Sequence, residues 1–227
     1  MISNLLFKLS KKISRKNLNI FINQSFKANY RNPKDYFVLN IGSGGDIEII
    51  IKNHFKHVFS IDIDVNRKPD QILDICDDNF QEKIKFKPNI ICCFEVLEHT
   101  KDPKKAIQNI YDILKYGDKV FLSVPFNFHI HDQPHDYFRF TYYGLKLLFS
   151  EFKKVEIKKR NGWLESIFVN IIRLEKEKNI FSKLLGKTFI IVYFLLLPLI
   201  IIIQKIFPSE KLTTGYYVEA QKWNIIL

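Results

Sequence analysis

A glycine-rich turn and a later carboxylate are the first residues of the sequence that could do chemistry. The apolar run VLNI leads into GSGGD, with glycines at 42, 44 and 45, and a later apolar run ends at Asp62. Glycines let backbone N–H groups approach a ligand closely, and a carboxylate about twenty residues later can accept hydrogen bonds from a ribose diol. A dinucleotide fingerprint would place its third glycine where the chain has Ile47, so NAD is disfavoured.

Histidines gather in a second segment, PFNFHIHDQPHDYFRFT, where His129, His131 and His135 are three of the six histidines of the chain. Imidazole titrates near neutral pH and suits the removal of a hydroxyl proton. A zinc site is disfavoured, because the His-x-His-x3-His spacing matches no helical ligand pattern and no cysteine is nearby, so no metal is predicted. Catalysis, acceptor binding and an ordinary loop remain open for this segment.

Alternating strand-like and helical segments must position these residues. Short apolar runs at 37–41, 58–62, 89–94 and 119–125 alternate with longer segments of helical type, which predicts a parallel sheet with crossover helices. The clearest predicted helix covers 102–116, with Asp102 as N-cap, Pro103 in its first turn and Gly117 at its end. Two further runs, FKKVEIKKR and GYYVEAQKW, alternate as strands do.

The order of these motifs resembles the class I S-adenosylmethionine-dependent methyltransferases, of the type 11-like kind associated with bacterial cell-surface glycans. The resemblance runs from about 38 to 125 and rests on VLNIGSGG, DICDD and the stretch from IICCFEVLEH to FLSVP. It implies an α/β fold: a Rossmann-like, doubly wound, mostly parallel seven-stranded sheet with its last strand antiparallel. A helical hydrophobic insertion would precede that last strand.

The resemblance also implies S-adenosyl-L-methionine as the cofactor and assigns residues to it. The expected cofactor contacts are Asn40, Gly42, Ser43 and Gly44 along the turn, Asp62 and Ile63 at the ribose, Asp74 and Ile75 flanking the adenine, and Glu95 lining the cleft. Two positions depart from the family pattern, since Asn40 replaces an acidic residue and Asp46 replaces the third glycine. An amide accepts a bond from the methionine ammonium more weakly than a carboxylate does.

In this family the segment after the fifth strand lies beside the transferable methyl group, so the histidine segment is expected to serve the acceptor. We predict His135 as general base oriented by Asp136, with His131 as the second candidate. Tyr137, Arg139 and His99 are predicted to contact the acceptor. Family members with a PHDYFRFT-type loop resemble methyltransferases of glycan assembly, so O-methylation of a sugar hydroxyl is favoured. This inference rests on resemblance to the family. A methyltransferase acting on RNA or protein, and a cofactor-binding module without activity, are the alternatives.

The composition of the chain limits which kinds of partner it can bind. The 227 residues are 47% hydrophobic, which excludes a disordered chain, and the net charge of +11 suits an anionic partner. Base methylation is disfavoured, because FEVLEH stands where those enzymes carry an Asn/Asp-Pro-Pro-aromatic motif, so nucleic acid is not the favoured partner. Three cysteines, two of them adjacent in an apolar run, predict no disulfide framework and a cytoplasmic chain.

The chain divides into three predicted parts. Residues 1–30 form a basic amphipathic helical region, 31–160 and 213–227 form the methyltransferase domain, and 161–212 form the hydrophobic insertion. Within that insertion 188–204 is almost wholly apolar, and as a helix it would reach about 25 Å against a hydrocarbon core of roughly 30 Å. Because 215–223 must return to the sheet, we predict a helix in the membrane interface or a hairpin turning about Pro198, at the inner membrane face. A buried helix or a dimer contact is the alternative.

Overall fold

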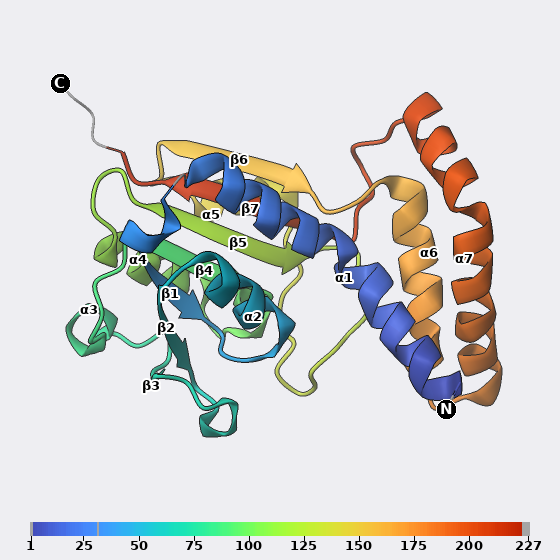
Figure 1. The fold of residues 1–227 in the computed structure, drawn as a ribbon, viewed down its shortest axis with the longest axis horizontal. Coiled ribbons are helices and arrows are strands. Elements are labelled where there is room, and N and C mark those ends of the chain that lie inside the picture. Colours follow the sequence, from blue (N-terminus) through green and yellow to red (C-terminus); the bar gives the residue numbers. More distant parts are fainter. Residues whose placement is uncertain (1, 31, 224–227) are drawn as a thin grey trace.

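A mixed seven-stranded sheet with helices on both faces forms the body of the chain, and a helical hairpin stands beside it (Figure 1). The structure, a computed structural model, describes residues 2–30 and 32–223, with side chains from residue 8 onward. The strands are β1 (Phe37–Ile41), β2 (His57–Asp62), β3 (Gln71–Ile72), β4 (Ile90–Phe94), β5 (Lys119–Pro125), β6 (Lys154–Lys159) and β7 (Gly215–Gln221). Their spatial order is β3-β2-β1-β4-β5-β7-β6.

The strand directions confirm the predicted fold class. The first five strands pair in parallel, and β7 runs antiparallel between β5 and β6. The helices are α1 (Ile2–Asn29), α2 (Gly45–His54), α3 (Phe80–Lys83), α4 (Pro103–Ile113), α5 (Tyr142–Leu148), α6 (Trp163–Arg173) and α7 (Ile180–Ile206). Chain order therefore alternates strand and α-helix through β5, except between β2 and β3, where a 3-10 helix (Val65–Arg67) stands.

Two hydrophobic layers lie on opposite faces of the sheet because successive strand side chains point to opposite sides. Leu39, Ile91 and Leu122 belong to the layer under α4 and α5. Val38, Ile90 and Phe121 belong to the layer under α1 and α2. The central strands read as continuous apolar runs because they are buried on both faces.

Local signals place the helix boundaries close to where the sequence predicts them. The Asp102 side chain accepts a hydrogen bond from the Lys105 N–H at 2.9 Å and begins α4. The helix ends at Ile113, earlier than the predicted 116, because Leu114 is already extended. Thr141 caps α5 in the same way, accepting from the Gly144 N–H at 3.0 Å.

Helix α1 spans the segment predicted as a basic amphipathic helix, and from residue 8 onward most of its apolar face is covered. Leu18, Ile22 and Phe26 are buried against the sheet with α2. Its earlier turns reach the hairpin, where Ile13 joins a third apolar cluster and the Ser10 hydroxyl donates to Glu175 at 2.8 Å. Packing on the domain is therefore the main use of this helix.

Helices α6 and α7 lie side by side as an antiparallel pair (Figure 1). The prediction of a hairpin turning about Pro198 is wrong, since α7 runs unbroken from Ile180 to Ile206. The turn lies before α7 instead, where the Asn179 side chain caps the helix. Pro198 has no backbone N–H and so removes one hydrogen bond from the helix. Residues of α7 before and after Pro198 pack on α6, and this packing keeps the helix continuous. The packed residues are Ile190, Tyr193 and Ile200, which share a cluster with Val169 and Ile172 of α6.

The outer side of α7 is apolar and exposed. Among the described residues α7 is the one helix long and apolar enough to cross a membrane by length and composition, and only 17% of its most apolar window is buried. Leu195 is 75% exposed. Both ends of the hairpin meet near the sheet, because the Trp163 indole N–H donates to the Phe207 carbonyl at 2.8 Å.

Candidate active site

The predicted site residues meet at the carboxyl ends of the central strands. The glycine turn follows β1, the 95–99 segment follows β4 and the 126–140 loop follows β5. In open α/β sheets, ligands bind outside this edge, at the point where the strand order reverses. That point lies between β1 and β4 here.

The glycine turn adopts a backbone that side chains resist. Gly42 and Gly44 have φ values of +89° and +88°. A Cβ on Gly42 would lie 2.5 Å from the Val96 methyl group, whereas a Cβ on Gly44 would meet nothing within 4 Å. Gly42 is therefore needed for backbone shape and for close contact with the segment after β4, while Gly44 is needed for shape alone.

Asp62 holds this turn over the end of β2. Its Oδ2 accepts from the Ser43 N–H at 2.8 Å, and its Oδ1 accepts from the Asp64 N–H at 2.9 Å. Each carboxylate oxygen has a further lone pair, so both could accept ribose hydroxyls. Ile63 follows directly and is 69% exposed, which leaves an apolar surface for an adenine ring.

Glu48 is a site residue that the sequence reasoning missed. Its carboxylate accepts from the Ser43 hydroxyl at 3.1 Å and from the Gly44 N–H, and it pairs with Lys52. Burial acts to raise its pKa, but hydrogen bonds from Lys52 and the Gly44 N–H outweigh this and lower the pKa. Its place in the first turn of α2 was the available signal, since carboxylates favour helix N-termini.

The Glu48 carboxylate bears on which ligand the turn accepts, although its ion pair with Lys52 offsets part of its charge. A pyrophosphate would be repelled there, whereas an ammonium group would be attracted. Asn40 adds an acceptor, because its amide nitrogen donates to the Gly42 carbonyl at 3.1 Å and leaves its side-chain oxygen for a ligand. The turn thus fits the methionine end of S-adenosylmethionine better than a dinucleotide.

The adenine side differs in part from the prediction. Asp74 is exposed, and its carboxylate accepts from the Cys76 N–H at 2.8 Å. Ile75, however, is 4% exposed and packs in the core under α4. Its side chain therefore does not flank the adenine as predicted, because the segment returns into the core at that residue.

Glu95, which is predicted to line the cofactor cleft, follows β4 and is held by Arg160, which the sequence reasoning did not identify. The carboxylate accepts from the Ser123 hydroxyl at 2.7 Å and from both terminal nitrogens of Arg160. Burial acts to raise the pKa of Glu95, but Arg160 outweighs it and the pKa is lowered. The pair links the end of β4 to the end of β6.

In the acceptor loop, Asp136 does not orient His135, which corrects that prediction. The Asp136 carboxylate accepts from the His131 N–H at 2.8 Å and from Arg139 at 2.6 Å. Burial acts to raise its pKa, but Arg139 and the His131 N–H outweigh it and bring the pKa to about 2. His135 is exposed instead, with its Nδ1 2.7 Å from the Tyr137 hydroxyl.

Arg139 is also not available to the acceptor as predicted. A guanidinium has five N–H donors, and here all five are used within the loop. They bond both Asp136 oxygens and the carbonyls of Phe128, His129 and Phe138. Arg139 therefore shapes the loop and does not bind the substrate directly.

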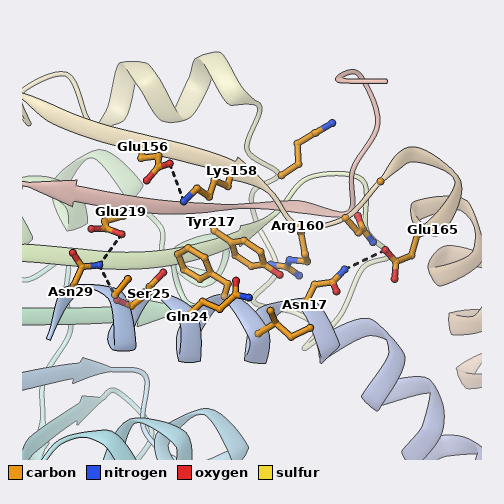
Figure 2. A pocket seen from close by; sticks show the side chains of 16 residues that line it. Asn17, Gln24, Ser25, Asn29, Glu156, Lys158, Arg160, Glu165, Tyr217 and Glu219 are labelled. Atoms are coloured by element: carbon orange, nitrogen blue, oxygen red, sulfur yellow. Dashed lines mark hydrogen bonds and ion pairs between the residues drawn. The ribbon is translucent and has the colours of Figure 1, made fainter. Parts of the chain in front are cut away.

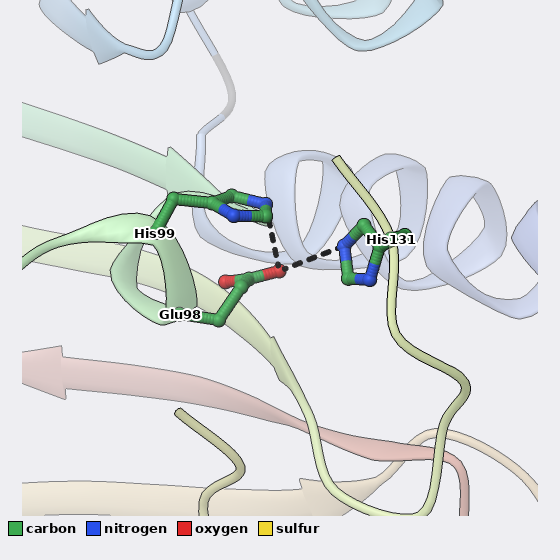
Figure 3. A group of neighbouring side chains, drawn as sticks. All are labelled: Glu98, His99 and His131. Carbon is green, nitrogen blue, oxygen red and sulfur yellow. Dashed lines mark ion pairs between the residues drawn. The ribbon is translucent and has the colours of Figure 1, made fainter. Parts of the chain in front are cut away.

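A compact group of three side chains lies beneath this loop (Figure 3). Glu98 is fully buried, and its Oε1 lies 3.8 Å from the Nε2 atoms of His99 and His131. Burial raises the pKa of the Glu98 carboxyl, and His131 partly counteracts this. His99 is tied to the loop, since its Nδ1 lies 2.6 Å from the His135 carbonyl. Glu98 was missed by the sequence reasoning, although it stands next to His99.

A groove of about 660 Å³ lies away from the glycine turn, between α1, β6 and β7 (Figure 2). Its lining is rich in amides and carboxylates, among them Asn17, Gln24, Asn29, Glu156 and Glu219. Phe21 and Tyr217 lie at its base, where the two buried rings stack with their centroids 4.4 Å apart. Arg160 lines the groove and also bonds Glu95, so it connects this groove to the cleft.

Comparisons with known proteins agree with this geometry. The methyltransferase domain family matches residues 15–161. A S-adenosylmethionine-dependent methyltransferase from Archaeoglobus fulgidus is similar in structure, with a TM-score of 0.58 and 17% identity over 92% of this chain and 94% of that one. No curated protein matches the chain.

A second similar structure is phosphoethanolamine N-methyltransferase 2 from Haemonchus contortus in complex with S-adenosyl-L-methionine. It has a TM-score of 0.55 and 17% identity over 92% of this chain, which spans 53% of that enzyme. The [4+2]-cyclase SpnF is also similar, with a TM-score of 0.53 and 11% identity over 89% of this chain and 80% of that one. At such identities these likenesses show the fold alone.

The family match covers more than half of the chain, and the chain therefore belongs to the methyltransferase domain family.

Proposed function

We propose that the chain methylates a sugar hydroxyl of a cell-surface glycan, using S-adenosylmethionine bound between the glycine turn and Asp62, at the inner face of the membrane. One observation carries the cofactor part: the buried Glu48 and the oxygen of Asn40 make the turn an acceptor of a cationic amine. The sugar and the membrane rest on two further features, the polar groove and the outer side of α7.

Methyl transfer to a hydroxyl requires mainly that the acceptor oxygen be aligned with the methyl group and that the hydroxyl proton be removed. When bound, S-adenosylmethionine supplies a methyl group on a sulfonium, which an acceptor oxygen attacks in line. His135 is the proposed general base because its Nδ1 is engaged by Tyr137 and its ring is exposed. In the tautomer with Nδ1–H donating to the tyrosine oxygen, the Nε2 lone pair is ready to take the hydroxyl proton.

The groove between α1, β6 and β7 supports a sugar acceptor. Amide and carboxylate side chains match the many hydroxyls of a glycan. Arg160 connects the groove to Glu95 in the cleft.

The outer side of α7 supports attachment at a membrane surface. Exposed apolar side chains follow one another along it, namely Phe181, Leu184, Leu195, Leu199, Ile202 and Ile206. Lys183, Lys205 and Lys211 lie at or beyond the ends of this apolar surface, and Lys8, Lys11 and Lys12 lie on the adjoining α1. Buried apolar area combined with attraction to anionic lipid is the usual basis of interfacial binding.

The acceptor class is tested by following a labelled methyl group. The full chain is incubated with membranes and methyl-labelled S-adenosylmethionine, and lipid-linked glycan, RNA and protein fractions are separated. We expect label in the glycan fraction that survives mild alkali, because an ether is stable there and an ester is not. Label confined to RNA or protein contradicts the proposal and supports the alternative acceptors.

His135→Ala should lower transfer roughly 10²- to 10⁴-fold, and His57→Ala on β2 is the matched control.

Membrane attachment has its own test. The double variant Leu195→Ser, Leu199→Ser should lose most of its flotation with vesicles containing anionic lipid. The control Leu147→Ser removes an equally exposed leucine from α5 and should float like the unaltered chain. Equal flotation of all three proteins contradicts an α7 contact with lipid.

A further inference from the structure

The group formed by Glu98, His99 and His131 presents three ligand atoms to one point. The Glu98 oxygen and the two histidine nitrogens all lie within 4.8 Å of one another (Figure 3). Glu98 and His99 come from the short helix Leu97–His99 after β4, and His131 comes from the loop after β5. Two separate segments therefore converge here.

Backbone carbonyls determine which ring nitrogens carry hydrogen. The Nδ1 of His99 lies 2.6 Å from the His135 carbonyl, and the Nδ1 of His131 lies 3.3 Å from the His129 carbonyl. A carbonyl oxygen only accepts, so each Nδ1 must be the donor. In a neutral imidazole the Nε2 then carries a lone pair, and both Nε2 atoms face the Glu98 oxygen.

Among the described residues, the Glu98 carboxyl group makes no hydrogen bond, and its nearest charged neighbours are the two imidazoles. Its side chain is fully buried. A buried carboxylate without a partner costs several kcal/mol. At 3.8 Å both Nε2 atoms are beyond hydrogen-bond distance of the Glu98 oxygen, so the histidines compensate its charge only as ion-pair partners when they are protonated.

We propose that Glu98, His99 and His131 bind one divalent transition-metal ion. Two imidazoles and a carboxylate are a ligand set for Zn²⁺, Mn²⁺, Fe²⁺ or Co²⁺, and they leave coordination positions open. The carbonyls of His135 and His129 hold the rings in the tautomer that ligation requires. The sequence prediction of no metal considered only the histidines of one loop, whereas two of these ligands come from another segment.

The position of the ion suggests its use. His99 is bonded to the backbone carbonyl of His135, so the proposed ion would lie near the segment that carries the proposed base. An acceptor hydroxyl in an open coordination position would have its pKa lowered and would lose its proton to His135 more readily. This catalytic role rests on the proposed function, whereas metal binding itself does not.

The test measures binding in the absence of cofactor and acceptor. The full chain, free of any histidine tag, is stripped with a chelator and titrated with Co²⁺ by calorimetry and visible absorption. We expect one ion per chain and a visible ligand-field band. His131→Ala and Glu98→Gln should each weaken binding at least about tenfold, while His57→Ala should bind like the unaltered chain.

Two outcomes overturn the site: no stoichiometric Co²⁺ binding by the folded chain, or an unchanged band in His131→Ala. Circular dichroism shows whether each variant is folded, and the more conservative His131→Gln replaces any variant that is not. Because no methyl transfer is involved, loss of the metal site leaves the proposed methyl transfer standing. A chain that binds the ion and transfers no methyl group overturns only the proposed function.

Discussion

At the level of single residues, charged side chains in the site divide between those that face a ligand and those that hold a loop. Asp62 and Glu48 bond the backbone of the glycine turn from opposite sides, which positions their charges for a nucleoside with a cationic tail. Arg139 and Asp136 bond each other and neighbouring carbonyls. Sequence alone does not separate these roles, because both groups are charged residues beside strand ends.

Asp62→Ala should weaken the binding of S-adenosylhomocysteine by roughly 10- to 100-fold. The substitution removes a charged acceptor from the ribose side, and such hydrogen bonds contribute about 1.5–3 kcal/mol. Isothermal titration calorimetry measures the change, with Asp112→Ala on the exposed face of α4 as the control. Equal affinity of the two variants would show that the ribose lies elsewhere.

Arg139→Ala should lower the free energy of unfolding by about 3 kcal/mol, because it leaves the buried Asp136 charge without its partner. Urea denaturation measures the loss. Lys104→Ala on α4 should change the same quantity by less than about 0.5 kcal/mol. An Arg139→Ala protein of normal stability with a raised KM for the acceptor would restore the acceptor-binding role that the contacts argue against.

Among helices, strands and turns, locally encoded features were predictable and distant ones were not. The caps Asp102 and Thr141 and the closing strand β7 follow from patterns within a few residues. The convergence of Glu98 with His131 depends on how two loops fold over the sheet edge, and no spacing in the chain encodes it. The turn predicted at Pro198 is wrong for the same reason. Contacts between α7 and α6, which are distant from Pro198 in sequence, keep the helix continuous there.

The glycine turn makes a prediction about two similar substitutions. Gly44→Ala should cost about 1–3 kcal/mol of stability from backbone strain alone. Gly42→Ala should cost more and should also abolish cofactor binding, because its methyl group would collide with Val96. Thermal unfolding and calorimetry with S-adenosylhomocysteine compare the two. Equal effects on stability and binding would contradict the contact with the segment after β4.

Across the whole molecule, the hairpin of α6 and α7 is an excursion that leaves and rejoins one sheet. It departs after β6 and returns into β7, which lies between β5 and β6. Both ends of the excursion must then lie on the same side of any membrane that α7 touches. The sequence predicts interfacial attachment for the same reason, because the last strand must return to the sheet. The turn that was predicted at Pro198 is wrong.

Labelling of cysteines from one side tests this topology. Lys101→Cys before α4 and Ser209→Cys after α7 should react equally with a membrane-impermeant reagent added to the cytoplasmic side of inverted vesicles. Neither should react when the reagent is added to the opposite side. Reaction of the two positions from opposite sides would mean that α7 crosses the bilayer and that β7 cannot pair with β5 in the membrane-bound chain.

The most direct test of the account is a crystal structure of the full chain with S-adenosylhomocysteine. We expect the ligand at the carboxyl ends of β1 and β2, with its amine near Glu48 and Asn40 and its ribose hydroxyls on Asp62. A ligand lying in the groove between α1, β6 and β7, or absent from crystals grown at saturating concentration, would contradict it.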